Sequence, residues 1–269
     1  IAGMDIQDGI RRLTGQFRIT TQEAKRYGKI AGDLYKDSWG DSIVELQKNV
    51  ATASAQLGDI TTAELAKVSA GILAIADTWD ADFNAVLRST SLLLDNDLAP
   101  SATAALDLVT AGFQAGGDKA GDLLDTIDEY AQHWAALGFT GEEALNQVIH
   151  GLQNGQRDAD KLADAVKEFR LRSVDDVDEV SQAYSDLGLE AGRLRLQILA
   201  GGPTAKTAFL TILKAIESVE DPVERNRVAI AFLGTQYEDL GPRALESLLT
   251  SEGALGDVET AAEDLGRSV

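Results

Sequence analysis

Apolar residues recur along most of this chain at three- and four-residue steps, the spacing of one face of an α-helix. The clearest runs are Leu65, Val68, Ile72 and Ile75, then Leu123, Leu124 and Ile127, then Leu162, Val166 and Phe169. The segment 193–198 alternates as a strand would, but Leu194 and Ile198 also fit one helix face, and we prefer the helix. The pattern predicts an all-α fold of roughly a dozen or more short helices.

Helix-start signals divide the chain into these short elements. Thr20 with Glu23, and Thr61 with Glu64, have the spacing of a capping box. In this motif a hydroxyl and a carboxylate each satisfy a free backbone N–H. The four prolines follow small or capping residues and are interpreted as helix openers: Pro100, Pro203, Pro222 and Pro242.

Helix-stop signals recur as a leucine followed by a glycine. Glycine suits the left-handed residue that closes a helix, and leucine suits the last buried turn. The pairs are Leu57 and Gly58, Leu137 and Gly138, Leu187 and Gly188, Leu240 and Gly241, and Leu255 and Gly256. With so many breaks, we expect a folded module of stacked antiparallel hairpins rather than one continuous rod.

Two weak internal repeats support this arrangement. The segment that starts at Ala111 aligns with the one that starts at His150, and 137–151 aligns with 187–201. The shifts are about 39 and about 50 residues, a range typical of stacked helical hairpins, although the period is irregular. The alignments place three glycines at similar positions between helices: Gly112, Gly151 and Gly201.

The charge is strongly acidic and unevenly distributed. The 269 residues include 44 Asp and Glu against 24 Lys and Arg, a net charge of −20. Acidic and basic residues balance over 1–60, so the excess lies in 61–269. The change predicts a charge-balanced N-terminal helical segment, 1–58, and an acidic helical-repeat region, 59–269. Because polyanion binding needs concentrated Lys and Arg, we expect no specific nucleic-acid binding.

The chain offers little material for a chemical site. It has no cysteine and two histidines, His133 and His150. The glycine-rich stretch 116–121 lacks the Gly-Lys-[Ser/Thr] order of a phosphate loop and is interpreted as a turn. The most apolar run, 68–76, is shorter than the ~20 residues of a membrane span. We expect no catalytic, cofactor or metal site and no membrane span.

Other conspicuous residues have structural interpretations. The tryptophans are expected in the core: Trp39, Trp79 and Trp134. The acidic clusters lack the spacing of a calcium loop and are interpreted as helix-start acids. They are Asp77, Asp80 and Asp82, then Asp95 and Asp97, then Asp175, Asp176, Asp178 and Glu179.

A series of short motifs follows one order along the chain and covers most of 13–250. The motifs are LTGQFRITTQEA from Leu13, Tyr27–Tyr35, Trp39–Ser42, Gly121–Tyr130, Leu137–Phe139, Gly151–Phe169 with Arg172, and Phe232–Leu240. In number and order they resemble the tail tape measure proteins of long-tailed phages. Because members of that family are far longer, and because the chain starts at Ile1, we expect a fragment of a longer chain.

The resemblance implies a virion structural protein rather than an enzyme. It implies a role in templating tail-tube assembly, setting tail length and ejecting the genome. The implied partners are the tail tube protein, tail-tip or distal tail proteins, tail assembly chaperones, and further copies of the chain, as a trimer. The implied location is the lumen or tip of the virion tail, after synthesis in the cytoplasm of the bacterial host.

Two other functions compete with this one. The internal repeats also fit a helical-repeat scaffold for protein–protein interaction in a non-viral setting. An envelope-degrading enzyme fragment is the third hypothesis, which the lack of histidine and cysteine constellations disfavours.

Overall fold

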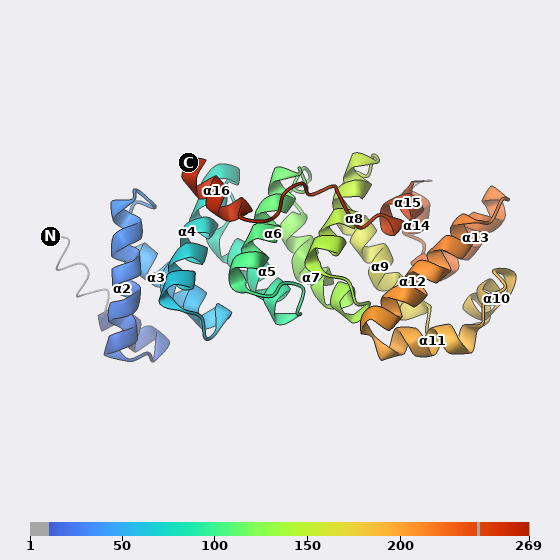
Figure 1. The fold of residues 1–269 in the computed structure, drawn as a ribbon, viewed down its shortest axis with the longest axis horizontal. Helices are drawn as coiled ribbons and strands as arrows, with labels where there is room; N and C mark the ends of the chain where they lie inside the picture. Colours follow the sequence, from blue (N-terminus) through green and yellow to red (C-terminus); the bar gives the residue numbers. More distant parts are fainter. Residues whose placement is uncertain (1–10, 241–242, 269) are drawn as a thin grey trace. The chain divides into compact units, whose positions relative to one another are not determined.

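The computed structural model describes residues 11–240 and 243–268. These residues are all-α, as predicted, and contain no strand. Helices labelled α2 to α16 follow one another mostly through short connections, and a long irregular segment joins α15 to α16 (Figure 1). The longest, α4 (Thr62–Trp79), has 18 residues. The described chain is therefore a succession of short helices.

The helices form two compact units. The first contains Ile1–Leu94, Pro100–Thr110 and Glu259–Val269, and the second contains Asp95–Ala99 and Ala111–Val258. The chain thus passes between the two units several times and returns to the first near its end. The sequence predicts a boundary near Gly58 from the change in charge along the chain. The two compact units are defined by packing and not by charge, so this boundary stays a prediction.

The first unit is built on three helices that pack in sequence order, α2 on α3 and α3 on α4. Helix α2 spans Thr21–Lys36 and α3 spans Ile43–Leu57. After α4, the chain continues with α5 (Phe83–Asp95) and α6 (Ala102–Gln114). The short helix α16 (Ala261–Ser268) packs on α4. All four apolar positions predicted on α4 are fully buried: Leu65, Val68, Ile72 and Ile75.

In the second unit α7 packs on α9, α9 on α13, and α8 on α15. The bounds are α7 (Leu123–Ala136), α8 (Gly141–Gln153), α9 (Asp160–Arg172), α10 (Asp178–Asp186), α11 (Ala191–Ala200), α12 (Gly202–Glu217), α13 (Pro222–Leu233), α14 (Tyr237–Leu240) and α15 (Ala244–Leu249). Buried aromatic rings form its core, with Phe169 packed edge-on against Phe209 at 4.6 Å and Tyr184 against Phe232 at 4.8 Å. The segment 193–198 lies inside α11, which confirms the helical interpretation.

The predicted helix starts are mostly correct. At Thr20 both halves of the capping box form, with Glu23 N–H donated to Thr20 Oγ1 and Thr20 N–H donated to Glu23 Oε2. At Thr61 the hydroxyl accepts from Glu64 N–H at 3.1 Å, which is one half of the box. Another complete box, missed in the sequence, opens α8 at Thr140.

The prolines differ in position. Pro203 and Pro222 lie in the first turns of α12 and α13, as predicted. Pro100 instead precedes Ser101, which is the capping residue of α6. The Ser101 hydroxyl accepts a hydrogen bond from Ala104 N–H at 3.1 Å. Pro242 lies outside the described residues.

Three leucine–glycine pairs end helices as predicted. Gly58, Gly138 and Gly188 follow α3, α7 and α10 with φ of +73°, +77° and +65°. The prediction at Gly256 is wrong, because this residue, with φ of +77°, lies in the irregular segment between α15 and α16. Gly241 lies outside the described residues.

The repeat at a shift of about 39 residues corresponds to one recurring turn. Gly112 and Gly151 lie in the last turns of α6 and α8, and each carbonyl accepts a hydrogen bond at 2.9 Å, from Gly117 N–H and Gln156 N–H respectively. The expectation that all three glycines occupy similar positions between helices is wrong, because of the three only Gly201 lies between helices, as the residue that caps α11 with φ of +74°.

The repeat at a shift of about 50 residues also has a structural counterpart. Phe139 N–H bonds the carbonyl of Trp134 at 3.1 Å, and Leu189 N–H bonds the carbonyl of Tyr184 at 2.9 Å. Trp134 and Tyr184 are both deeply buried. The same helix-closing motif therefore ends α7 and α10.

Candidate functional site

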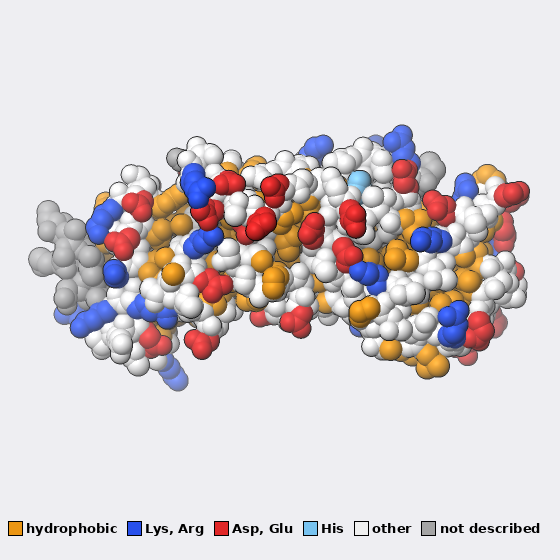
Figure 2. All heavy atoms as spheres, in the orientation of Figure 1, with side chains coloured by type: hydrophobic (Ala, Val, Ile, Leu, Met, Phe, Trp, Pro, Cys, Tyr) orange, Lys and Arg blue, Asp and Glu red, His pale blue; other side chains and the backbone are white. Residues whose placement is uncertain are grey.

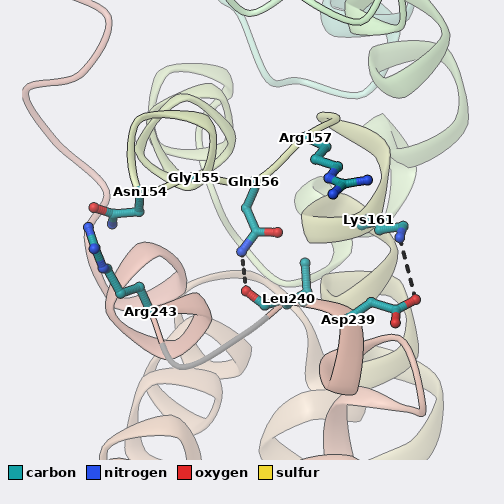
Figure 3. Close-up of a pocket in the computed structure, with 8 residues that line it drawn as sticks. All are labelled: Asn154, Gly155, Gln156, Arg157, Lys161, Asp239, Leu240 and Arg243. Atoms are coloured by element: carbon teal, nitrogen blue, oxygen red, sulfur yellow. Dashed lines mark hydrogen bonds and ion pairs between the residues drawn. The ribbon is translucent and has the colours of Figure 1, made fainter.

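A polar cleft of about 510 Å³ lies in the second unit, between the turn that joins α8 to α9 and the chain around α14 (Figure 3). It is lined by Asn154, Gly155, Gln156, Arg157, Lys161, Asp239, Leu240 and Arg243. Three of these side chains are cationic and one is anionic. The cleft is therefore locally basic within a strongly acidic chain.

Local backbone geometry positions the lining. Asn154 caps α8, and Gly155, with φ of +100°, turns the chain out of α8 toward α9. Gln156 then donates its side-chain amide N–H to the carbonyl of Leu240. Figure 3 shows this bond between the two sides of the cleft. The turn and α14 are thereby joined by a hydrogen bond between two residues of the lining.

Two of the three cationic side chains in the cleft are not neutralised by an acidic partner among the described residues and are available to an anion. Lys161 Nζ lies 3.4 Å from Asp239 Oδ2. Arg157 and Arg243 are exposed, and neither forms an ion pair with any residue in 11–240 or 243–268. Guanidinium groups bind carboxylates and phosphates through paired N–H donors. The lining of Arg157, Lys161 and Arg243 therefore offers cationic groups that suit an anion.

A second polar feature lies on α8, which contacts the segment 247–255 from the far end of the chain. Its side chains Asn146, Gln147, His150 and Asn154 make these contacts, and we call them the α8 polar face. Asn146 Oδ1 accepts from the backbone N–H groups of Ala254 at 2.7 Å and Leu255 at 3.0 Å. One buried side chain thus satisfies two backbone donors.

The other contacts of the α8 polar face are similar. Gln147 Nε2 donates to the carbonyl of Leu248 at 2.6 Å, and His150 Nε2 lies 2.8 Å from the carbonyl oxygen of Glu252. Asn154 is different, since it donates to a side chain, the hydroxyl of Ser247. Backbone atoms are the main partners, so the α8 polar face fixes the path of 247–255 largely regardless of its sequence.

The two histidines have separate roles. His133 is buried on α7, and its Nδ1 lies 3.1 Å from Arg170 Nη1. Burial, followed by the positive charges of Arg170 and Lys167, lowers the pKa of His133. His150 belongs to the α8 polar face. No group of three or more potential metal-ligating residues occurs in the part of the chain that the structure describes.

The acidic clusters only partly follow the sequence interpretation. Asp82 begins α5 by accepting from Ala85 N–H at 2.9 Å, and Asp178 lies in the first turn of α10, as helix-start acids should. Asp80 instead ends α4 in a left-handed conformation, with φ of +54°. Asp176 pairs with Arg195 at 2.7 Å. The cluster of Asp77, Asp80 and Asp82 therefore spans the end of α4 and the start of α5.

Two further interpretations can be compared with the structure. The stretch 116–121 is a turn, in which Asp118 Oδ1 accepts from Leu123 N–H at 3.0 Å. Trp134 is fully buried, as expected, whereas Trp39 and Trp79 are partly exposed, and the expectation that they are core residues is wrong. Among the helices of the described residues, none is both long and apolar enough to cross a membrane.

Comparison with known proteins decides the family. A family model described as "Phage-related minor tail protein" matches residues 21–234. The chain belongs to the phage minor tail protein family. This result confirms the resemblance to phage tail proteins that the motifs indicated.

Two curated relatives also match the chain. The chain is 33% identical to the "Probable tape measure protein" of Streptomyces phage phiC31 over 178 residues, which are 66% of this chain and 24% of that protein. It is 30% identical to the "Uncharacterized protein YqbO" of Bacillus subtilis (strain 168) over 241 residues, 87% of this chain and 15% of that one. The matched region is thus a quarter or less of each relative. No solved structure matches the chain.

Proposed function

We propose that this phage minor tail protein chain is a structural module of a tail tape measure protein. The family match over 21–234, together with the similarity to the phiC31 probable tape measure protein, carries the proposal. The whole protein would template tail-tube assembly, set tail length and take part in genome ejection. Its partners would be the tail tube protein, tail-tip or distal tail proteins, tail assembly chaperones and further copies, as a trimer.

Within such a protein this chain would act as a folded module rather than as part of an extended ruler. A helix rises about 1.5 Å per residue, so 61–269 as one helix would extend about 310 Å. The longest described helix has 18 residues and extends only about 27 Å. Packed cores and left-handed glycines favour the short helices over a continuous one. The module would therefore contribute contacts at the tail lumen or tip, after synthesis in the host cytoplasm.

The acidic surface suits a place along the path of DNA. On the face shown in Figure 2, acidic side chains are spread over many helices rather than gathered in one patch. A surface of like charge disfavours adhesion of the phosphate backbone. DNA would therefore pass such a module without being retained.

A helical-repeat interaction scaffold is the second candidate. The equivalent turns at Gly112 and Gly151 favour it, because repeated helical hairpins commonly form extended binding surfaces. Unlike the tape measure proposal, the scaffold proposal predicts that phage tails stay normal when this segment is deleted.

The two candidates are separated by deleting 61–269 in frame from the parent gene of a phage or prophage and imaging the particles by electron microscopy. We expect tails of unchanged length that fail to infect. Tails about 310 Å shorter would show that the segment is extended ruler. Unchanged length with full infectivity would contradict a role in the tail and favour the scaffold.

A further inference from the structure

The cleft drawn in Figure 3, which we call the basic cleft, has cationic groups on both sides of a central hydrogen bond. Gln156 donates this bond to the carbonyl of Leu240. Figure 3 shows Arg157 and Lys161 on one side of the bond and Arg243 on the other. A ligand that engages both sides at once therefore needs at least two anionic groups.

Most of the positive charge in the basic cleft is not neutralised by its own lining. Lys161 Nζ lies 3.4 Å from Asp239 Oδ2, and both side chains are exposed to solvent. In the part of the chain that the structure describes, Arg157 and Arg243 have no acidic partner. Guanidinium groups with free N–H donors bind carboxylates through paired hydrogen bonds. The lining thus holds three cations against one carboxylate, in a chain whose net charge is −20.

The basic cleft also presents two hydrogen-bond acceptors whose orientation is fixed. The Ser247 hydroxyl donates to the carbonyl of Arg243 at 3.0 Å, so its oxygen accepts from Asn154 Nδ2, also at 3.0 Å. The other amide atom, Asn154 Oδ1, accepts from no described residue, and the same is true of Gln156 Oε1. Carboxamide oxygens accept hydrogen bonds from N–H donors. The cleft therefore suits a ligand that carries N–H groups as well as negative charge.

This combination favours an acidic peptide over other polyanions. A peptide offers carboxylates to the guanidinium groups and backbone N–H groups to the amide oxygens, whereas a phosphate chain offers anionic groups alone. The cleft measures about 510 Å³, the size of a pocket for a small ligand, whereas a specific DNA interface buries about 1,000 Å² or more. The acidic side chains spread over the face in Figure 2 also repel a long polyanion more than a short one.

We propose that the basic cleft is a docking site for a short acidic segment of a partner protein. Arg157 and Arg243 bind two of its carboxylates, one on each side of the central hydrogen bond. Asn154 and Gln156 accept hydrogen bonds from the backbone N–H groups between those carboxylates. The partner is defined by its chemistry, a run of a few residues with at least two acidic side chains. This inference uses only the second compact unit and does not depend on the proposed function.

Fluorescence anisotropy with a labelled hexaglutamate peptide tests the site on the purified chain. At about 50 mM salt, where exposed charges are weakly screened, we expect saturable binding that a labelled hexaglutamine peptide does not show. The double variant Arg157→Ala/Arg243→Ala should weaken binding about tenfold, because it removes two charge-assisted contacts at an exposed site. The matched control is Arg193→Ala, an exposed arginine of α11 in the same unit, which should leave the affinity unchanged. Circular dichroism verifies that the variants keep their helices.

Two results of these titrations would overturn the proposal. The first is hexaglutamate binding no tighter than hexaglutamine. The second is equal weakening by Arg193→Ala and by the double variant, because binding would then follow the net charge of the chain rather than the basic cleft.

Competition distinguishes the acidic peptide from phosphate ligands. Unlabelled hexaglutamate should displace the labelled peptide at a lower concentration than tripolyphosphate, which is also a polyanion but has no N–H donors. A DNA duplex should likewise compete poorly. If either phosphate ligand displaced the peptide at the lower concentration, the basic cleft would be a phosphate site and the acidic-peptide proposal would be wrong.

Discussion

Gly138 and Gly202 approach so closely that a Cβ on Gly138 would lie 2.1 Å from the carbonyl oxygen of Gly202. Gly138 also has φ of +77°, as the residue that turns the chain from α7 into α8. Both the space and the backbone conformation at this point therefore require glycine. The contact joins the α7–α8 turn directly to the beginning of α12.

Replacing Gly138 should be among the most damaging single changes in the second unit. We expect Gly138→Val to lower the free energy of unfolding by roughly 3 kcal/mol, because a left-handed conformation and a backbone clash both oppose the side chain. Urea unfolding followed by circular dichroism measures the change. The matched control is Gly32→Ala in α2, where an added Cβ meets nothing within 4 Å and helix propensity favours alanine. Equal stability of the two variants would contradict the close packing of Gly138 on Gly202.

The capping box at Thr140 should give the stability of α8 a pH dependence. Burial raises the pKa of Glu143, but hydrogen bonds from Lys206 and Thr140 outweigh it and hold the pKa below its usual value. A carboxyl group whose pKa is lower in the folded state stabilises the fold above its unfolded pKa. This stabilisation should be lost as the pH falls through the folded pKa.

To isolate this effect, the free energy of unfolding is measured for the parent chain and for Glu143→Gln between about pH 3 and pH 7. The glutamine variant should be less stable at neutral pH and should approach the parent under acid. A constant difference across this range would show that the ion pair with Lys206 contributes no pH-dependent stability.

The α8 polar face should protect the backbone amides that it binds. Asn146→Ala removes the acceptor for the amides of Ala254 and Leu255, and it should lower stability by about 2 kcal/mol. Hydrogen–deuterium exchange over 247–260 should become faster. Asn84→Ala, on the exposed side of α5, is the control and should leave exchange in this segment unchanged. Normal protection in the Asn146 variant would mean that other contacts hold the segment.

The acidic chain should not retain duplex DNA at about 150 mM salt, because binding to the phosphate backbone requires concentrated cationic groups. Fluorescence anisotropy with a labelled duplex measures binding. If binding were observed and the double variant Arg157→Ala/Arg243→Ala abolished it, the basic cleft would be a DNA site and the expectation of free passage would be wrong. Binding that survives this double variant would place the contact elsewhere.

The helices were predictable because their signals are local. The spacing of Leu65, Val68 and Ile72 and the Thr20 capping box depend on residues within one or two turns of each other. Even so, the box at Thr140 is missed and the helix start near Pro100 is misplaced by a residue or two. Local patterns identify a helix more reliably than they locate its ends.

The candidate sites could not be predicted, because distant parts of the chain assemble them. The basic cleft combines Arg157 and Lys161 with Arg243, whose proximity no local pattern indicates. Its charge is also opposite to that of the chain as a whole. The prediction of a helix end at Gly256 fails for a related reason. Its neighbourhood is irregular because Asn146, more than a hundred residues earlier, binds the backbone there.

The central claim, that this part of the tail protein acts as a folded module, is tested most directly by changing its fold without changing its length. Gly138→Val and, as the control, Gly32→Ala are introduced separately into the parent gene. Infectivity and tail length are then measured for each variant. We expect tails of normal length in both variants, with infectivity lost only in Gly138→Val. Full infectivity of Gly138→Val particles, with the destabilisation verified on the purified chain, would contradict the claim.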